Sequence, residues 1–308
     1  TGSLFRSSVS SNLPGNVELI SGPSCPVCVT SQGYLDAAVE LAAVPGTTLC
    51  TYGDMVRVPG RRGSLETARA GGADIRIVYS ARDALRFALE HPDRKVVFLA
   101  VGFETTAPGT AAVLKEAQVR DAENFTVLPA HKRVLPAMEF LLKAGDVPID
   151  GFLCPGHVSV VLGSRCYEPV ARDYGKPCVV AGFEPKPMLT AILMLLRQVK
   201  ADRARVENAY RVAVRPDGNP AARALVDEVF EPGPAVWRAM GVLPASGLRL
   251  RAPYRRFDAF ERYGVAEGPD ESPAGCRCGD VIQGRVKPPA CPLFGDVCTP
   301  LAPVGPCM

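Results

Sequence analysis

The chain has 308 residues, of which 47% are hydrophobic, and its formal net charge is +3. This length suffices for two or three domains, and so large an apolar fraction excludes a globally disordered chain. So small a net charge argues against a nucleic-acid partner and against a membrane-surface patch. No apolar run approaches the roughly 20 residues of a membrane span, and the first residues show no secretory pattern, so we expect no membrane contact.

The cysteine content sets the chemistry to look for. There are eleven cysteines, an odd number, in a long chain with α/β patterning. Secreted disulfide scaffolds are instead short and loop-rich. We therefore expect a cytoplasmic protein whose thiols serve metal or redox chemistry.

The first part of the chain alternates between predicted strands and predicted helices. The strands are expected at 16–20, 47–52, 74–79 and 96–101, and the helices at 32–43, 64–70, 80–90 and from 109 onward. Ser64 and Ser80 are the expected N-caps of two of these helices. The fully apolar run at 96–101 indicates a central parallel strand. The alternation predicts a doubly wound parallel sheet.

A second α/β unit is predicted to follow. Its strands are expected at 124–128, 149–154 and 178–181, its helices at 135–144 and 187–199, and further helices at 205–212 and 220–230. The string Val-Gly-Phe-Glu that ends at Glu104 is echoed by Ala-Gly-Phe-Glu ending at Glu184, which suggests two similar half-domains facing a cleft. We thus predict two Rossmann-like parallel-sheet domains at 1–122 and 123–230, and a small Cys-rich iron–sulfur domain at 231–308.

Cys25 and Cys28 form a Cys-x-x-Cys pair between the predicted strand at 16–20 and the predicted helix at 32–43. A helix N-terminus lowers the pKa of a nearby thiol, and ligands bind at the carboxyl ends of parallel strands. The pair therefore indicates a dithiol that cycles with a disulfide. Two alternatives are a pair of half-buried loop thiols and a zinc half-site completed by the tail.

Five further cysteines lie in the Gly- and Pro-rich tail: Cys276, Cys278, Cys291, Cys298 and Cys307. Thiolates ligate both iron–sulfur clusters and structural zinc. Zinc sites usually show ligand pairs two to four residues apart, whereas only Cys276 and Cys278 are close here. The spacing favours a [4Fe–4S] cluster over a zinc site, with one of the five cysteines spare or redox-active.

Three polar residues at strand ends are candidate site residues. His157 follows the predicted strand at 149–154, and Glu104 and Glu184 each follow a Gly-Phe pair. They suit metal ligation or contact with a bound ligand, although a capping or helix-dipole role is equally consistent with their positions. His131 with its neighbours Lys132 and Arg133 suits either an anion-binding corner or a solvated helix start.

Several strings, taken together, resemble the HypD family of hydrogenase maturation proteins. They are SGPSCPVCVT at 21–30, TYGDM at 51–55, RVPG at 57–60, GFETTAP at 102–108, PGHVS at 155–159, AGFEP at 181–185 and, in the tail, CRCG at 276–279, FG at 294–295 and CTP at 298–300. They follow the order of the family across almost the whole chain.

The resemblance implies a scaffold that assembles the Fe(CN)₂CO part of the [NiFe]-hydrogenase centre with a HypC-like chaperone and a HypE-like cyanide donor. It also implies two α/β domains around a cleft and a third domain that holds a [4Fe–4S] cluster. We expect a maturation scaffold with a thiol-redox, electron-transfer role, and the sequence leaves open whether the chain is an enzyme. By motif, Cys25 and Cys28 match the redox-active pair. Cys278, Cys291, Cys298 and Cys307 match the cluster ligands, and Cys276 is the fifth cysteine.

The chain departs from the family pattern at three places. The family carries a Cys-Gly-x-His segment, implicated in holding iron, where residues 1–6 have neither Cys nor His, and it continues beyond the Cys-Met at which this chain stops. We expect both differences to reflect truncation; if they are native, the chain has lost its iron site and is an adaptor. Leu301 stands where an acidic residue is expected. The alternative function is a thiol–disulfide oxidoreductase with a structural zinc tail.

Overall fold

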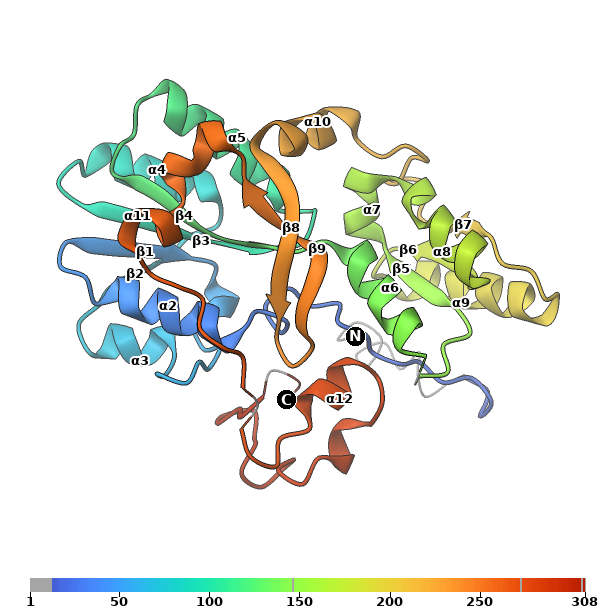
Figure 1. The fold of residues 1–308 in the computed structure, drawn as a ribbon. Helices are drawn as coiled ribbons and strands as arrows, with labels where there is room; N and C mark the ends of the chain where they lie inside the picture. The colour runs from blue at the N-terminus through green and yellow to red at the C-terminus, as the bar shows by residue number, and fades with distance from the viewer. Residues whose placement is uncertain (1–12, 146, 272, 306, 308) are drawn as a thin grey trace.

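The computed structural model describes residues 13–145, 147–271, 273–305 and 307 (Figure 1). Residues 1–6 and Met308, on which the predicted truncations depend, lie outside this part of the chain. Among the described residues, no helix is both long and apolar enough to cross a membrane.

The first unit is a four-stranded parallel sheet with strand order β2-β1-β3-β4. Its strands are β1 (Thr47–Thr51), β2 (Asp74–Ile77), β3 (Lys95–Gly102) and β4 (Phe125–His131), and its helices are α2 (Gln32–Ala42), α3 (Leu65–Ala70), α4 (Ala81–Glu90) and α5 (Ala107–Val119). Successive side chains of a strand point to opposite faces. Val96 and Phe98 accordingly join the core under α4 and α5, whereas Val97 and Leu99 join the core under α2 and α3. The apolar run of β3 is thus explained by burial on both faces.

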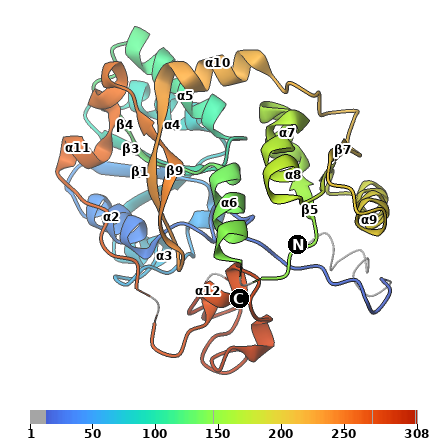
Figure 2. The same cartoon turned by 45° about the vertical axis from the view of Figure 1, so that its right-hand side comes forward.

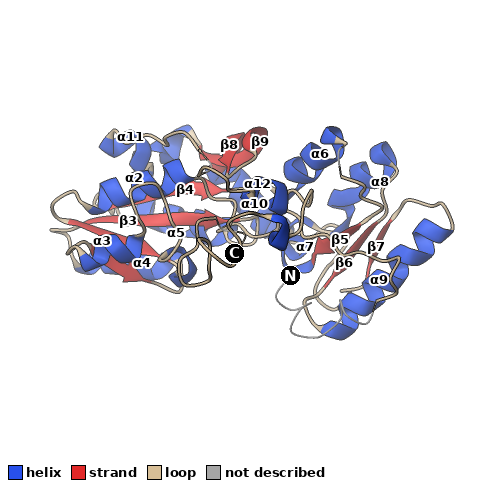
Figure 3. Cartoon of the chain, turned by 90° about the horizontal axis from the view of Figure 1, so that it is seen from below, coloured by secondary structure: helices blue, strands red, loops and turns tan. Residues whose placement is uncertain are grey.

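The second unit is a three-stranded parallel sheet with strand order β5-β6-β7, set apart from the first sheet (Figure 3). Its elements are β5 (Phe152–Pro155), β6 (Cys178–Ala181), β7 (Val206–Asn208), α6 (Val134–Ala144), α7 (Gly156–Leu162), η3 (Ser164–Tyr167), α8 (Glu168–Tyr174) and α9 (Pro185–Lys200). The predicted α/β class with parallel sheets is confirmed. The cleft and the separate iron–sulfur domain stay predictions.

An antiparallel hairpin stands between the two units and reaches the C-terminal segment (Figure 1). Helix α10 (Pro220–Val229) leads back from the second unit to the first, where it packs on α5 (Figure 2). The hairpin follows as β8 (Phe230–Trp237) and β9 (Gly241–Leu250), packed beside β4 and α6. The remaining elements are short: η2 (Gly53–Met55), η4 (Ala252–Phe257), α11 (Ala259–Tyr263), α12 (Cys278–Ile282) and η5 (Pro288–Ala290). The turn at 238–240 thereby meets the Cys-rich segment.

Two predicted elements are wrong. Residues 16–20 form no strand, because the tail holds them: Glu18 pairs with Lys287 at 2.9 Å, and the space where Gly284 would carry a side chain is filled by Ile20. The predicted helix at 205–212 is instead strand β7 and a turn, since Val206 pairs with Cys178 of β6.

The sequence also misplaced one strand and missed the hairpin. Strand β4, which the predicted boundary between residues 122 and 123 assigns to the second domain, pairs with β3 and completes the first sheet. The hairpin β8–β9 was not predicted. The division into three domains stays a prediction.

Candidate functional site

One buried core joins residues from both α/β units, the hairpin and the Cys-rich segment. We call it the junction core, and its buried members are Val29, Phe103, Ala137, Val158, Trp237, Leu243, Cys278 and Ile282. Trp237 is fully buried, its Nε1 donates to Ser246 Oγ at 2.8 Å, and its ring stacks on that of Phe103 with 6.0 Å between centroids. Three motifs far apart in the sequence, at 21–30, 102–108 and 155–159, therefore each contribute a residue to a core that also holds a tail cysteine.

The Cys-x-x-Cys loop is fixed to the end of the hairpin. Thr30 forms an antiparallel bridge with Trp237, and the N–H of Arg238 donates to the carbonyl of Val29 at 2.9 Å. Helix α2 begins after the N-cap Ser31, whose hydroxyl accepts from a backbone N–H. Cys25 and Cys28 thus lie in a turn just before α2, and residues 13–24, the described part of the chain ahead of them, form no strand, which corrects the predicted strand-end position.

The two thiols of this loop differ in acidity. The N–H of Cys28 donates to Cys25 Sγ at 3.2 Å. The Cys28 thiol also donates to Cys25, and this bond, followed by backbone N–H groups, lowers the pKa of Cys25 to about 7 despite its burial. The same bond and burial raise the pKa of Cys28. Cys25 is therefore the thiolate near neutral pH and the nucleophile of the pair, because the thiolate is the reactive form.

The tail cysteines are gathered and mostly buried. Cys278, Cys291 and Cys298 are buried, and Cys276 and Cys307 are half-buried. Cys278 donates a hydrogen bond to Cys307, which lowers the pKa of Cys307 to about 7. A Cβ placed on Gly305 would lie 3.1 Å from Cys278 Sγ and 3.2 Å from Cys276 Sγ, so both sulfurs face one backbone position. Such close approach requires glycine at residue 305.

Backbone N–H groups point at several of these sulfurs. The N–H of Arg277 donates to Cys291 Sγ at 3.5 Å, and that of Val304 donates to Cys298 Sγ at 3.2 Å. All-thiolate ligation with hydrogen bonds to sulfur is the environment of iron–sulfur clusters, and the donors present therefore fit such a group. Among the described residues, no group of three or more His, Cys, Asp or Glu side chains is arranged to hold a single metal ion.

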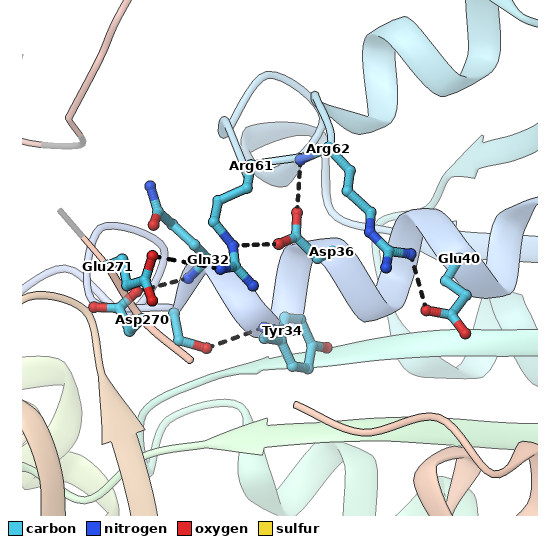
Figure 4. A network of polar contacts seen from close by, with 9 residues as sticks. Gln32, Tyr34, Asp36, Glu40, Arg61, Arg62, Asp270 and Glu271 are labelled. Carbon is cyan, nitrogen blue, oxygen red and sulfur yellow. Dashed lines mark hydrogen bonds and ion pairs between the residues drawn. The ribbon is translucent and has the colours of Figure 1, made fainter. Parts of the chain in front are cut away.

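The segment that leads into the tail is fastened to α2 (Figure 4). The carboxylate of Asp270 accepts from the N–H of Gln32 at 2.9 Å and from the N–H of Ala239 at 2.6 Å. Beside it, Arg61 pairs with Glu271 at 3.7 Å. Asp270 therefore connects the helix after the Cys-x-x-Cys loop, the hairpin turn and the start of the Cys-rich segment.

His157 and Glu184 lie elsewhere, at the carboxyl edge of the second sheet. His157 is exposed near the start of α7, with its ring 4.7 Å from that of Phe183. Glu184 is the exposed N-cap residue of α9. These two residues share one edge of the second sheet, whereas the loop that carries Cys25 and Cys28 contacts the hairpin.

Glu104 is buried, unlike its counterpart Glu184. Its Oε1 accepts from the N–H of Val134 at 3.0 Å, and its Oε2 has no partner. Burial raises the pKa of Glu104 to about 7. Glu104 is therefore a buried acid that holds the start of α6.

His131 and Lys132 are buried rather than solvated. His131 lies within hydrogen-bonding distance of Thr110, and Lys132 Nζ donates to the Val236 carbonyl at 2.7 Å. Burial lowers the pKa of His131 to about 4 and that of Lys132 to about 8. The predicted solvated helix start is wrong, and these side chains serve internal hydrogen bonds.

Arg238 is a residue of the site that sequence reasoning missed. It is only 4% exposed and lies in the turn between β8 and β9. The only signal in the sequence is a lone cation within the apolar run VWRAMGV. Pattern alone does not reveal that such a cation is buried.

Comparison with known proteins places the chain in a family. The profile described as "HypD: Hydrogenase formation hypA family" matches residues 1–308. The chain belongs to the HypD family. It is similar to Hydrogenase maturation factor HypD of Cupriavidus necator, with 50% identity over all of this chain and 83% of that protein. The HypD proteins of Azotobacter vinelandii and Escherichia coli are 46% and 45% identical, over 100% and 99% of this chain and 83% and 82% of theirs. The resemblance drawn from the motifs is confirmed.

Proposed function

We propose that this HypD-family chain is a scaffold and thiol-redox protein in the assembly of the Fe(CN)₂CO moiety of [NiFe]-hydrogenase. Its relatives bear the name hydrogenase maturation factor. The observation that carries the finer proposal is the junction core, through which the Cys-x-x-Cys loop and the tail cysteines pack together. A redox pair and an electron-carrying centre need such proximity to act on each other.

The proposed resident cofactor is a [4Fe–4S] cluster held by Cys278, Cys291, Cys298 and Cys307, with Cys276 as the fifth cysteine. When bound, such a cluster supplies or stores electrons one at a time. The buried sulfurs and the N–H groups directed at them support this assignment. The all-thiolate donor set is also the set that iron–sulfur clusters use.

The chemistry of the chain itself lies in Cys25 and Cys28. Starting from the Cys25 thiolate and the Cys28 thiol, oxidation of the pair forms one S–S bond and releases one proton and two electrons, which are delivered toward the iron and cyanide cargo. Cys25 supplies the thiolate sulfur of this bond, and Cys28 supplies the second sulfur. A cytoplasmic dithiol reductant restores the pair by thiol–disulfide exchange.

The cargo is iron with cyanide and CO ligands, held between the two α/β units jointly with a HypC-like chaperone. A HypE-like protein donates the cyanide, and the assembly takes place in the cytoplasm. His157 and Glu184 are exposed at one sheet edge and are accessible to the cargo or to a partner. Glu104 is buried and positions α6 rather than touching the cargo.

The test is the maturation of a [NiFe]-hydrogenase in cells that carry variants of this chain. Cys25→Ser and Cys28→Ser should each abolish hydrogenase activity, because either change prevents the disulfide. They should also remove the infrared bands of cyanide and CO from the complex with the HypC-like partner. Cys166→Ser, a half-buried thiol of η3, is the matched control and should leave maturation intact. Normal maturation with either loop variant would contradict the proposal.

A further inference from the structure

Arg238 is a buried cation where the Cys-x-x-Cys loop meets the Cys-rich segment. Its backbone N–H is bonded to Val29, directly after Cys28. The guanidinium has five N–H donors, and its Nη1 has no hydrogen-bond partner although it is buried. Among the described residues, the only other buried side-chain atom left in this state is Oε2 of Glu104. A buried charged donor without a partner is unfavourable, so its retention calls for an acceptor.

Sulfur is an available acceptor in the cavity beside Arg238. Arg238 lines a small cavity together with Asp270, Cys276, Cys278 and Gln32. Asp270 already accepts two backbone N–H bonds. When the Gln32 amide is oriented with its oxygen toward the guanidinium, Nη2 of Arg238 donates a hydrogen bond to that oxygen at 3.2 Å. Nη1 is then the nitrogen that still lacks an acceptor.

Electrostatics points the same way. Burial lowers the pKa of Arg238, and the groups whose anionic forms oppose this effect are Asp270, Cys278, Cys276 and Cys28, in that order. Three of the four are sulfur groups, and they come from both the tail and the Cys-x-x-Cys loop. The cation therefore lies within electrostatic reach of both sets of cysteines.

We propose that Arg238 is a positioning residue whose Nη1 would donate a hydrogen bond to a sulfur atom of a cluster bound in the Cys-rich segment. This inference rests on the proposed function, because it requires the cluster. A fixed cation that donates to cluster sulfur stabilises the reduced, more negative state and raises the reduction potential. Arg238 thereby sets how readily the cluster accepts an electron next to the Cys25–Cys28 pair.

The first test detects the proposed hydrogen bond directly in the wild-type chain. The chain is produced with arginine carrying ¹⁵N only in the guanidinium group, purified without air and reduced, and pulsed electron paramagnetic resonance is recorded on the cluster. We expect a ¹⁵N coupling to the cluster that disappears in Arg238→Gln. The control is Arg165→Gln, because Arg165 lies in the second unit and pairs with Asp217 at 2.7 Å; it should keep the coupling. A silent wild-type spectrum, or a coupling that persists in Arg238→Gln, overturns the inference.

The second test measures the reduction potential of the cluster in the same proteins. Arg238→Gln should shift the one-electron equilibrium at least tenfold toward the oxidised form, which corresponds to a potential about 59 mV more negative. Arg165→Gln should stay within threefold of wild type. An unchanged potential in Arg238→Gln overturns the inference, and if that variant does not fold, the labelled wild type alone decides.

The proposed cofactor and the role of Arg238 can be disproved separately. A wild-type chain that binds neither iron nor sulfide defeats the proposed cofactor, and with it this inference. A wild-type chain with about four irons and four sulfides but no ¹⁵N coupling defeats only the role of Arg238.

Discussion

The buried carboxyl of Glu104 makes a prediction about stability that is independent of any metal. Glu104→Gln keeps an oxygen that accepts from the N–H of Val134 but removes the charge. Glu184→Gln is the matched control, because Glu184 ends the second Gly-Phe-Glu string yet is exposed. The two variants make the same chemical change in opposite environments.

The magnitude follows from the pKa of Glu104. Burial raises this pKa from 4.5 to about 7 in the folded chain. Between these values the folded chain keeps a proton that the unfolded chain has released, so its stability falls as pH rises through this window and is constant above it. The difference amounts to about 3 kcal/mol in full, of which about 2 kcal/mol falls between pH 5.5 and 8. The advantage of Glu104→Gln over wild type should therefore grow by about 2 kcal/mol over that range.

Comparing variants removes the contributions of other groups. Burial lowers the pKa of His131 to about 4, which gives stability the opposite slope between pH 4 and 6.5, but wild type and both variants share this term. The assay is anaerobic urea unfolding at pH 5.5 and pH 8, followed by the fluorescence of Trp237, the single and fully buried tryptophan. The free-energy difference between Glu184→Gln and wild type should not change with pH. A difference for Glu104→Gln that is equally constant would refute the reasoning.

Three further outcomes are expected. The pKa of Cys25 is about 7 and that of Cys28 is raised, so an alkylating reagent should modify Cys25 before Cys28, at a rate that rises through pH 7. Mass spectrometry of the peptides measures the order, and modification of Cys28 before Cys25 would contradict this assignment. Gly279→Ala should lower the free energy of unfolding by about 1–3 kcal/mol, because the added Cβ would lie 3.0 Å from the 238–240 turn. Gly109→Ala adds a Cβ in open space and should not lower it. Equal effects of the two variants in urea unfolding would speak against this contact. Asp270→Asn weakens two backbone hydrogen bonds and should destabilise the attachment of the segment that leads into the tail by about 1–3 kcal/mol. Proteolysis of this segment should therefore be faster in the variant. An unchanged cleavage rate would mean that these two hydrogen bonds contribute little.

The first sheet was predictable because its signals are local. Ser64 and Ser80 both form the capping boxes that their positions before helices suggest. The apolar run of β3 predicts a strand buried on both faces, and its neighbours follow from strand–helix alternation. These features need no knowledge of distant contacts.

The hairpin was missed, and the strand at 16–20 was wrongly predicted, because both outcomes depend on distant partners. The sequence FEPGPAVW of β8 contains two prolines and lacks alternation, so only its pairing with β9 and its packing beside β4 make it a strand. The apolar residues before the Cys-x-x-Cys loop find no neighbouring strand, and Ile20 packs on the tail instead.

In the candidate site, too, local features were predictable and features that depend on distant contacts were not. The Cys-x-x-Cys pair and the tail cysteines are evident from spacing, but their common junction core and the cation between them are not. The repeated Gly-Phe-Glu string suggested equal roles for Glu104 and Glu184, yet one is buried under α6 and the other is exposed. Burial is a property of the assembled fold, and a short repeat does not specify it.

The central claim is that the tail cysteines hold an iron–sulfur cluster beside the redox pair. The most direct measurement is the iron, zinc and acid-labile sulfide content of the chain purified without air, together with its visible spectrum. The account predicts about four irons and four sulfides per chain, with broad absorption that bleaches on reduction. Stoichiometric zinc without sulfide would contradict it and would make the tail a structural zinc site beside a thiol–disulfide oxidoreductase.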